Sequence, residues 1–379
     1  MEFSFDGALA RLRDRGRDLG RELVEPTVAS RDRHARWDPE MFGALAGAGL
    51  TGLLLPGDRG GLGLSVLEAV ALLEGFGEGA TDAGMAFAVG AHGILCGVPI
   101  AALGTELQRE RCLPGIAFGK RLCGLALSEI DGDATAAGGA VTAVRNRDGW
   151  LLEGRRSNVV NAPYADLFLL TATTGSDGGR TTFLIDRDAS GLATLPEPEA
   201  VTMRTASSAE LVLNECQVTS DAVLGTPGEA NRQLVPLLAA LDRTCLLAPW
   251  LGILRALADH TSSLAIGQTL LGGPLARSQS VRMAVVDLQT RLELGATLLY
   301  LAAWQLDRVE RAPRLDAATA KLFLVGAVRD ALDTAAGFAG VGPHHLVERT
   351  RRDVLELAGT GGGDEVLRSV IAGALLDLG

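Results

Sequence analysis

The sequence contains none of the residue patterns that mark common metal and redox centres. Its five cysteines form no Cys-x-x-Cys pair, and its five histidines show neither His-x-x-x-His nor His-Glu-x-x-His spacing. Scattered cysteines of this kind are typical of small buried hydrophobic side chains and of reduced thiols in the cytosol. We therefore predict free thiols, no metal site and a cytoplasmic protein.

Positive charge is also in short supply. The 379 residues include 46 Asp and Glu against 35 Lys and Arg, which gives a net charge of −11 at pH 7. Because binding to nucleic acid needs a basic face, this balance argues against DNA and RNA as partners. The first residues lack a basic stretch followed by an apolar one, so we expect no signal peptide.

One uncharged run, residues 83–105, is long enough to cross a bilayer. It contains several glycines, a proline and a histidine. These residues suit a helix, or a helix–turn–helix, buried in a large core better than they suit a membrane span. We predict a core helix here and no membrane association.

The kind of secondary structure changes twice along the chain. Residues 1–122 carry apolar positions at helical spacing, and residues 226–379 do so again. Residues 123–225 contain short strands, with an Asp148-Gly149 turn that is typical of a hairpin. This order predicts an α+β protein with an N-terminal α-helical domain, a middle β-barrel-like domain and a C-terminal four-helix bundle.

The expected helices of the last zone are apolar on one broad stripe. They cover residues 234–258, 281–309 and 317–336, too apolar for single helices in water, so they should pack as a bundle. Their excess of Ala and Leu also suits contact between subunits, which predicts a homodimer or homotetramer. Asp364 and Glu365 are expected to begin the last helix, where carboxylates favour the helix dipole.

A series of short motifs runs through the chain in a fixed order. They are residues 49–56 with 60–63, 113–120 with 126–129, 152–156 with Asn161-Ala162, 274–276 with Gln279, 337–340, and 347–349 with Arg352-Asp353. Each is weak alone, but together and in this order they resemble the acyl-CoA dehydrogenase family over essentially the whole chain. The resemblance implies the acyl-CoA dehydrogenase fold and α,β-dehydrogenation of an acyl thioester. It also implies FAD, bound between the β-domain and the bundle with a second subunit contributing.

The family's catalytic base is missing from its usual place. In the family, a Glu that follows the Arg-Asp pair takes the α-proton of the thioester. The ungapped alignment from Asp353 to Arg368 puts Gly361 at that position, and alignment on the Gly-Thr pair puts Ala358 there. Neither side chain can accept a proton, so Gly361 marks a lost catalytic position.

A second base position in the family keeps a carboxylate. Some members place the base on a different helix, directly before an arginine, and Asp242 and Arg243 stand in that register. Asp is one methylene shorter than Glu, which matters because a base must come within about 2.6–3.2 Å of its proton. We take Asp242 and Arg243 as candidate catalytic residues. The alternative is that Asp242 caps the helix or pairs with Arg243 or another neighbour.

The residues that the resemblance places around the flavin ring have also changed. A hydroxyl remains at Ser128, but Glu129 and the acidic residues after it stand where a serine would meet the pyrophosphate, and like charges repel. Asn158 and Val160 replace the Trp and Thr of the family's Trp-Ile-Thr motif. The stacking surface and the hydroxyl of that motif are therefore both lost.

The changes continue in the segments that contact FAD from the helical domain. Gln268 replaces an arginine that reaches the pyrophosphate across subunits, and Leu271 replaces the phenylalanine of the same motif. Thr334 replaces a glutamine, whereas Gly337 and Gly340 keep glycines that allow close backbone approach. FAD is thus implied by the family, but these residues predict a degraded binding site.

Three functions fit these observations. The first is a flavin-free, non-redox enzyme that acts on an acyl thioester or a related biosynthetic intermediate, with Asp242 or Glu129 as acid or base. The second is an FAD-dependent dehydrogenase of an acyl-CoA or acyl-carrier-protein substrate with Asp242 as base. The third is a non-catalytic subunit of a heteromeric dehydrogenase. We favour the first, because the flavin contacts changed on both sides.

Overall fold

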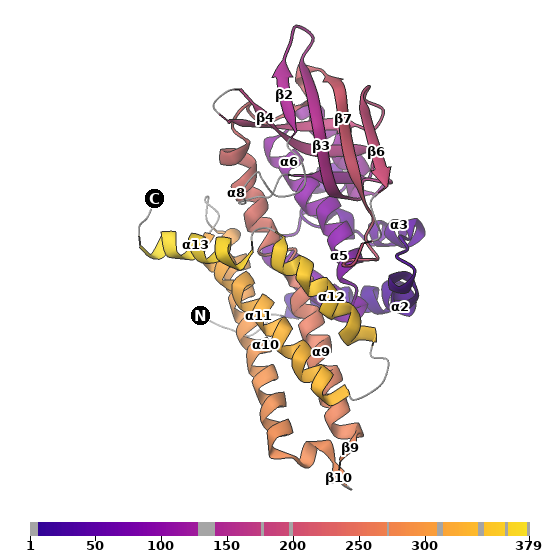
Figure 1. The fold of residues 1–379 in the computed structure, drawn as a ribbon, viewed down its shortest axis with the longest axis vertical. Coiled ribbons are helices and arrows are strands. Elements are labelled where there is room, and N and C mark those ends of the chain that lie inside the picture. The colour runs from indigo at the N-terminus through magenta and orange to yellow at the C-terminus, as the bar shows by residue number, and fades with distance from the viewer. Residues whose placement is uncertain are drawn as a thin grey trace.

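The structure is a computed structural model of the whole chain. It describes residues 7–127, 141–175, 178–196, 200–270, 273–308, 314–339, 345–360 and 363–376. Three parts follow one another in Figure 1: a first group of helices, a β-sheet and a second group of helices that includes a long bundle. The predicted α+β fold, with its helical, sheet and helical parts in that order, is confirmed.

The first part is helical, as predicted. Its elements are α1 (Gly7–Leu19), η1 (Gly20–Val24), α2 (Glu25–Arg33), α3 (Pro39–Gly47), η2 (Leu50–Gly52), η3 (Gly57–Arg59), α4 (Val66–Ala80), α5 (Ala83–Gly90), η4 (Ala91–Gly97), α6 (Val98–Leu103) and α7 (Glu106–Ala117). Side chains at the N-caps start several of these helices by accepting hydrogen bonds from the first backbone N–H groups. Ser65 with Glu68 and Thr105 with Gln108 form reciprocal capping boxes at α4 and α7.

The uncharged run is a core helix, as predicted. It forms the continuous helical segment α5, η4 and α6, with a π-helical middle. Within the described residues, Ala83–Leu103 is a helix apolar and long enough to cross a membrane, but 72% of its most apolar window is buried inside the protein. Burial of this kind is typical of a core helix.

The middle part is one eight-stranded sheet. The strands are β1 (Cys123–Ala126), β2 (Thr142–Arg145), β3 (Trp150–Val160), β4 (Leu167–Thr174), β5 (Arg180–Asp186), β6 (Leu192–Pro196), β7 (Ser208–Val218) and β8 (Val223–Leu224). They lie in the order β6-β7-β3-β1-β4-β5-β8, and β2 pairs with both β3 and β4. The hairpin predicted at Asp148-Gly149 is confirmed, because Arg145 pairs with Trp150 across it.

The last part returns to helices. It contains η5 (Ser220–Ala222), α8 (Ala230–Asp242), α9 (Ala248–Gly267), the short β9 (Thr269–Leu270) and β10 (Gly273–Pro274), η6 (Leu275–Arg277), α10 (Gln279–Leu306), α11 (Arg314–Ala339), α12 (His345–Gly359) and α13 (Asp364–Leu375). The helices predicted near 281–309 and 317–336 are confirmed as α10 and α11. The last helix begins at Asp364, as expected from its two carboxylates.

The prediction of one continuous helix over residues 234–258 was wrong. The chain leaves helical geometry after Asp242 and begins α9 only at Ala248. Pro249 stands in the first turn of α9, where its missing N–H costs nothing but where it disfavours helix in the residue before it. This break places Asp242 at the end of a helix rather than in the middle of one.

Glycines let the two helical parts pack backbone to backbone. A Cβ on Gly75 of α4 would lie 1.8 Å from the carbonyl oxygen of Arg13 in α1. A Cβ on Gly252 of α9 would lie 2.0 Å from the carbonyl oxygen of Glu74 in α4. Because no side chain fits in these gaps, α4 lies between α1 and α9, and residues of both helical parts share one hydrophobic core.

This packing predicts a large effect of one methyl group at Gly252. We expect Gly252→Ala to lower stability by about 3 kcal/mol, because the new Cβ meets backbone that cannot move aside. Thermal unfolding of the purified protein measures the loss. Gly326→Ala on α11 is the matched control, since a Cβ there meets nothing within 4 Å. Helix propensity should then raise stability by up to about 1 kcal/mol. Equal midpoints for the two variants would contradict the packing argument.

Candidate functional site

Asp242 forms a buried ion pair with a helix distant in the sequence. Lys321 of α11 donates from Nζ to Asp242 Oδ2 at 2.7 Å. Both residues are closed off from water, with 5% of Asp242 and 1% of Lys321 exposed. Burial of a charge is costly unless a partner of opposite charge lies beside it, so each side chain holds the other in place.

The same ammonium group also reaches the end of α12. Lys321 Nζ donates to the backbone carbonyl of Thr360, the residue directly before Gly361. Lys321 therefore contacts both Asp242 and Thr360, the residue directly before one of the aligned positions of the family's usual base. Gly361 itself lies outside the described residues, and Ala358 is half-buried in α12.

The sequence left open whether Asp242 pairs with Arg243 or with another neighbour. Its partner is Lys321, on another helix, and the neighbouring Arg243 is the buried C-cap residue of α8. Lys321 contacts one carboxylate oxygen of Asp242, Oδ2.

An apolar helix face leads to this carboxylate. Leu234, Leu238 and Asp242 follow one another at intervals of four residues, so they share one face of α8. A small cavity of about 10 Å³ lies along this face, between α8 and the sheet. Its lining residues are Leu127, Thr171, Arg180, Ala230, Asn231, Leu234, Val235 and Leu238.

The corner at the end of β3 holds the first group of expected flavin contacts. Asn158 is exposed and adopts a left-handed conformation with φ of 54°, and Val160 is buried in the sheet. Asn161 follows, fully buried, also left-handed at φ 66°. Its Nδ2 donates to the carbonyls of Ala88 at 3.0 Å and Cys123 at 3.2 Å. The corner is therefore pinned to α5 and β1.

The second group of expected contacts lies at the far end of α11. Gln268 Nε2 donates to the carbonyl of Ala339 at 3.5 Å, and the Thr334 hydroxyl donates to its own helix at Asp330. Around Gly337 nothing lies within 4 Å of the place a Cβ would take. Ser128, Leu271 and Gly340 lie outside the described residues.

Within one chain, the contacts expected at the far end of α11 lie far from Asp242. Ala339 follows Lys321 by 18 residues of the same helix, which separates Gln268 from Asp242 by about 27 Å at the ordinary helical rise. In Figure 1 the end of α9 and the β9–β10 hairpin lie at the bottom of the bundle, far from the sheet. Within one chain, Gln268 and Thr334 therefore lie far from Asp242.

The described residues do not fit FAD as the resemblance requires. A pyrophosphate needs a cation or several N–H donors, and the side chain at the arginine position is an amide already bonded to a backbone carbonyl. At the corner, Asn158 offers no aromatic face and Val160 no hydroxyl. At Asn158, Val160 and Gln268 the described residues lack the groups that the resemblance implies for contact with FAD.

Sequence reasoning missed Lys321. A signal was present, because Lys120 and Lys321 are the only lysines beside 33 arginines, and Lys321 interrupts an apolar helix. A lone cation in such a helix requires a buried partner. The identity of that partner is a tertiary fact, since Asp242 lies 79 residues earlier in the chain.

Comparison with known proteins gives consistent matches along the chain. The family models for the acyl-CoA dehydrogenase N-terminal domain, middle domain and C-terminal domain match residues 8–120, 124–216 and 238–376.

Curated relatives of similar length include two bacterial enzymes. An L-prolyl-[peptidyl-carrier protein] dehydrogenase of Pseudomonas fluorescens is 29% identical over 330 residues, or 86% of each chain. A short-chain specific acyl-CoA dehydrogenase of Megasphaera elsdenii is 29% identical over 373 residues, or 95% of each. Among solved structures, the prolyl acyl carrier protein oxidase AnaB has a TM-score of 0.92 at 27% identity, with 98% of this chain and all of that chain covered.

The ion pair predicts strongly coupled effects of two substitutions. We expect Lys321→Met to lower the free energy of unfolding by about 3–5 kcal/mol, because it leaves the Asp242 carboxylate buried beside an apolar group. Adding Asp242→Asn should restore part of the loss, since it removes the uncompensated charge. Equilibrium unfolding of the two single variants and the double variant measures the coupling. Additive losses would show that the side chains act independently.

Proposed function

This chain belongs to the acyl-CoA dehydrogenase family, and we propose that it acts on acyl thioesters with Asp242 as the base for the α-proton. The observation that carries the proposal is the ion pair of Asp242 with Lys321 beside the Thr360 carbonyl. It puts a charged carboxylate next to the chain segment where the family's usual base would follow.

The local geometry suits removal of a proton next to a carbonyl. Leu234 and Leu238 lie on the same face of α8 as Asp242 and are buried, so the surroundings of the carboxylate along this face are apolar. Lys321 holds Oδ2, which leaves Oδ1 to take the proton. Buried surroundings strengthen this interaction between charge and proton, because the local dielectric is low.

We further propose that this proton transfer proceeds without a resident flavin. The amide of Gln268 and the side chains at Asn158 and Val160 do not supply the contacts that the cofactor needs. Without an electron acceptor, the proton taken by Asp242 returns to the substrate at the same or another carbon. The product would be an isomer or a stereoisomer of the substrate, with no change of oxidation state.

A second candidate is FAD-dependent dehydrogenation of a thioester carried by coenzyme A or a carrier protein. The relatives favour it, because they include a dehydrogenase of prolyl-carrier protein and a short-chain acyl-CoA dehydrogenase. In that case Asp242 would take the same proton. Gln268 and Thr334 of a second copy, at the far end of α11, would help to hold the cofactor.

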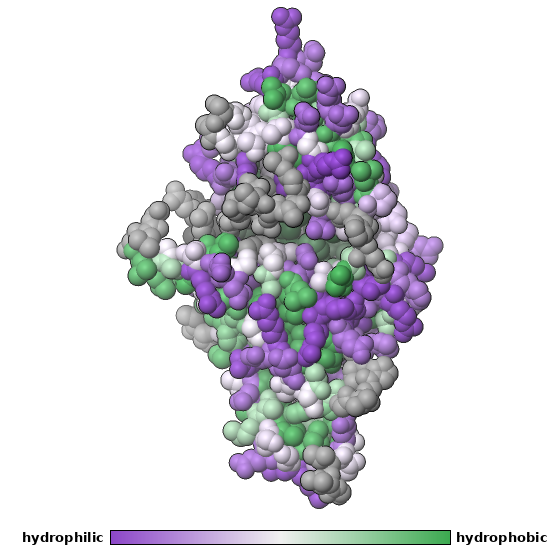
Figure 2. Space-filling view, in the orientation of Figure 1, coloured by the Kyte–Doolittle hydropathy of each residue, from purple (hydrophilic) through white to green (hydrophobic). Residues whose placement is uncertain are grey.

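Association of copies of this chain has support on α10. This helix exposes a row of large apolar side chains, and a groove of about 390 Å³ lies along it. Figure 2 shows hydrophobic surface among hydrophilic residues toward the end of the bundle where α9 and α10 approach the β9–β10 hairpin. The apolar residues of the row are Met283, Val286, Leu294, Leu301 and Trp304. We propose a homo-oligomer that uses this face.

The absorption spectrum separates the two candidate reactions. The protein, incubated with excess FAD and passed through a size-exclusion column with light scattering, should elute as an oligomer without flavin bands. The physical reason is the missing cation at Gln268 and the missing stacking ring at Asn158. Flavin that remains with the protein peak would replace the first candidate by the second.

Proton exchange tests the base directly. We expect the protein to exchange the α-protons of butyryl-CoA, or of another member of a short acyl-CoA series, with D2O, as followed by NMR. Asp242→Asn should slow this exchange by about 10²-fold or more, the usual contribution of a general base. Asp333→Asn, at an exposed position of α11, is the control and should match the unaltered protein. Exchange that survives Asp242→Asn would exclude Asp242 as the base.

A further inference from the structure

The loop before β7 is held in a strained conformation. Met203 has φ of 49°, a left-handed geometry that costs a non-glycine residue about 1–3 kcal/mol. Its carbonyl accepts the N–H of Ala206 at 2.8 Å, which closes a tight turn. Such a turn persists only when its surroundings hold it, and residues 200–207 are held from two sides.

The first anchor comes from α12. Asp353 Oδ1 accepts the backbone N–H of Met203 at 2.7 Å, and only 3% of Asp353 is exposed. One turn further along, Glu356 accepts the hydroxyl of Thr202 at 3.2 Å. Helix α12 thus holds the loop by a hydrogen bond to Met203, the strained residue itself.

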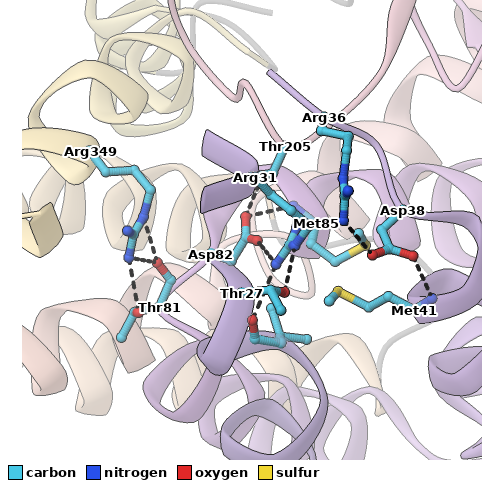
Figure 3. Close-up of polar contacts among 11 residues, drawn as sticks. Thr27, Arg31, Arg36, Asp38, Met41, Thr81, Asp82, Met85, Thr205 and Arg349 are labelled. Atoms are coloured by element: carbon cyan, nitrogen blue, oxygen red, sulfur yellow. Dashed lines mark hydrogen bonds and ion pairs between the residues drawn. The ribbon is translucent and has the colours of Figure 1, made fainter. Parts of the chain in front are cut away.

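The second anchor comes from the N-terminal helices. The Thr205 hydroxyl donates to Asp82, and Arg31 donates to the other oxygen of Asp82 at 2.8 Å, as Figure 3 shows. Asp82 also caps α5 by accepting from the N–H of Met85 at 3.0 Å. Glycine at position 84 makes room for the Thr205 side chain, because a Cβ there would lie 2.3 Å from the Thr205 hydroxyl.

The loop passes this restraint on to the corner of the candidate site. The carbonyl of Ser207 accepts the N–H of Asn161 at 2.6 Å, and Ser208 pairs with Val160 in the sheet. The corner that contains Asn158 therefore has its backbone position set by a loop that two other domains hold.

We propose that Asp353 is a positioning residue, which fixes the loop 202–207 and, through the Ser207–Asn161 hydrogen bond, the corner at Asn158 to Asn161. This inference deepens the proposed function. It rests on that function only because it treats the corner at Asn158 to Asn161 as part of the candidate site. The hydrogen bonds named above join α12, the loop, α5 and β3 in one continuous path. Loss of the Asp353 contact should therefore raise the amide exchange of Asn161.

The surroundings of Asp353 make this anchor sensitive to pH. Burial, and the nearby carboxylates of Asp82 and Asp32, raise the pKa of Asp353 to about 7, although the Met203 N–H and Arg349 act in the opposite direction. Where the loop opens to water, the pKa returns toward its ordinary value of 3.8. The bound proton thus stabilises the closed loop below that value, and this stabilisation is lost as the pH rises toward 7. The charged groups of neighbouring elements are Asp82 on α5, Arg31 and Asp32 on α2, and Arg349, Arg352 and Glu356 on α12.

Hydrogen–deuterium exchange of the full-length protein tests the proposal without any substrate. After correction for intrinsic rates, exchange of the amides of residues 203–207 should rise at least about tenfold from pH 5.5 to pH 7.5. Asp353→Asn keeps an oxygen that can accept from Met203 but cannot titrate, so it should keep protection and lose the pH dependence. Asp353→Ala should raise exchange about tenfold both in residues 203–207 and at Asn161.

The control is Glu348→Ala, an exposed position of the same helix, which should leave exchange unchanged. Exchange at Asn161 that stays unchanged in Asp353→Ala, or a pH dependence that survives in Asp353→Asn, would overturn the proposal. If Asp353→Ala does not fold, the pH dependence of Asp353→Asn alone decides. A failure of the proposed proton chemistry at Asp242 leaves these exchange measurements unaffected, so the two ideas fail separately.

Discussion

The candidate site depends on one ammonium group that is closed off from water between three helices. A buried cation costs several kcal/mol unless partners surround it, and Lys321 has a carboxylate and a backbone carbonyl as partners. These come from the end of α8 and the end of α12. The requirement to compensate this charge therefore ties the end of α8 and the end of α12 to α11 at one side chain.

Much of the fold could be predicted from sequence because its signals are local. The hairpin at Asp148-Gly149 follows from turn chemistry, and the start of α13 at Asp364 follows from carboxylates at a helix N-terminus. The break after Asp242 was missed because apolar periodicity continues through it, although Pro249 is typical of the first turn of a new helix. Periodicity reports which face of a segment is buried, and it does not report whether the backbone stays continuous.

The site was harder to predict because its contacts are long-range. Asp242 was identified by its place in a family motif, but its partner Lys321 could be found only from the fold. The flavin-side residues show the same limit. Asn158 and Gln268 were named together from motifs, yet the structure places Gln268 at the far end of α11. The separation agrees with the expectation from the resemblance that the position of Gln268 serves a site across subunits, whereas the distance itself could be found only from the fold.

Asp242 and Asp353 are both buried, but different groups compensate their carboxyls. We relate this difference to their proposed roles. Asp242 pairs with the ammonium group of Lys321 at 2.7 Å. Asp353 faces a backbone N–H and two further carboxylates, and burial raises its pKa to about 7. A change of pH across neutrality therefore acts on the joint between the domains at Asp353. Through that joint, the proposed positioning role of Asp353 would make the geometry of the corner at Asn161 respond to pH.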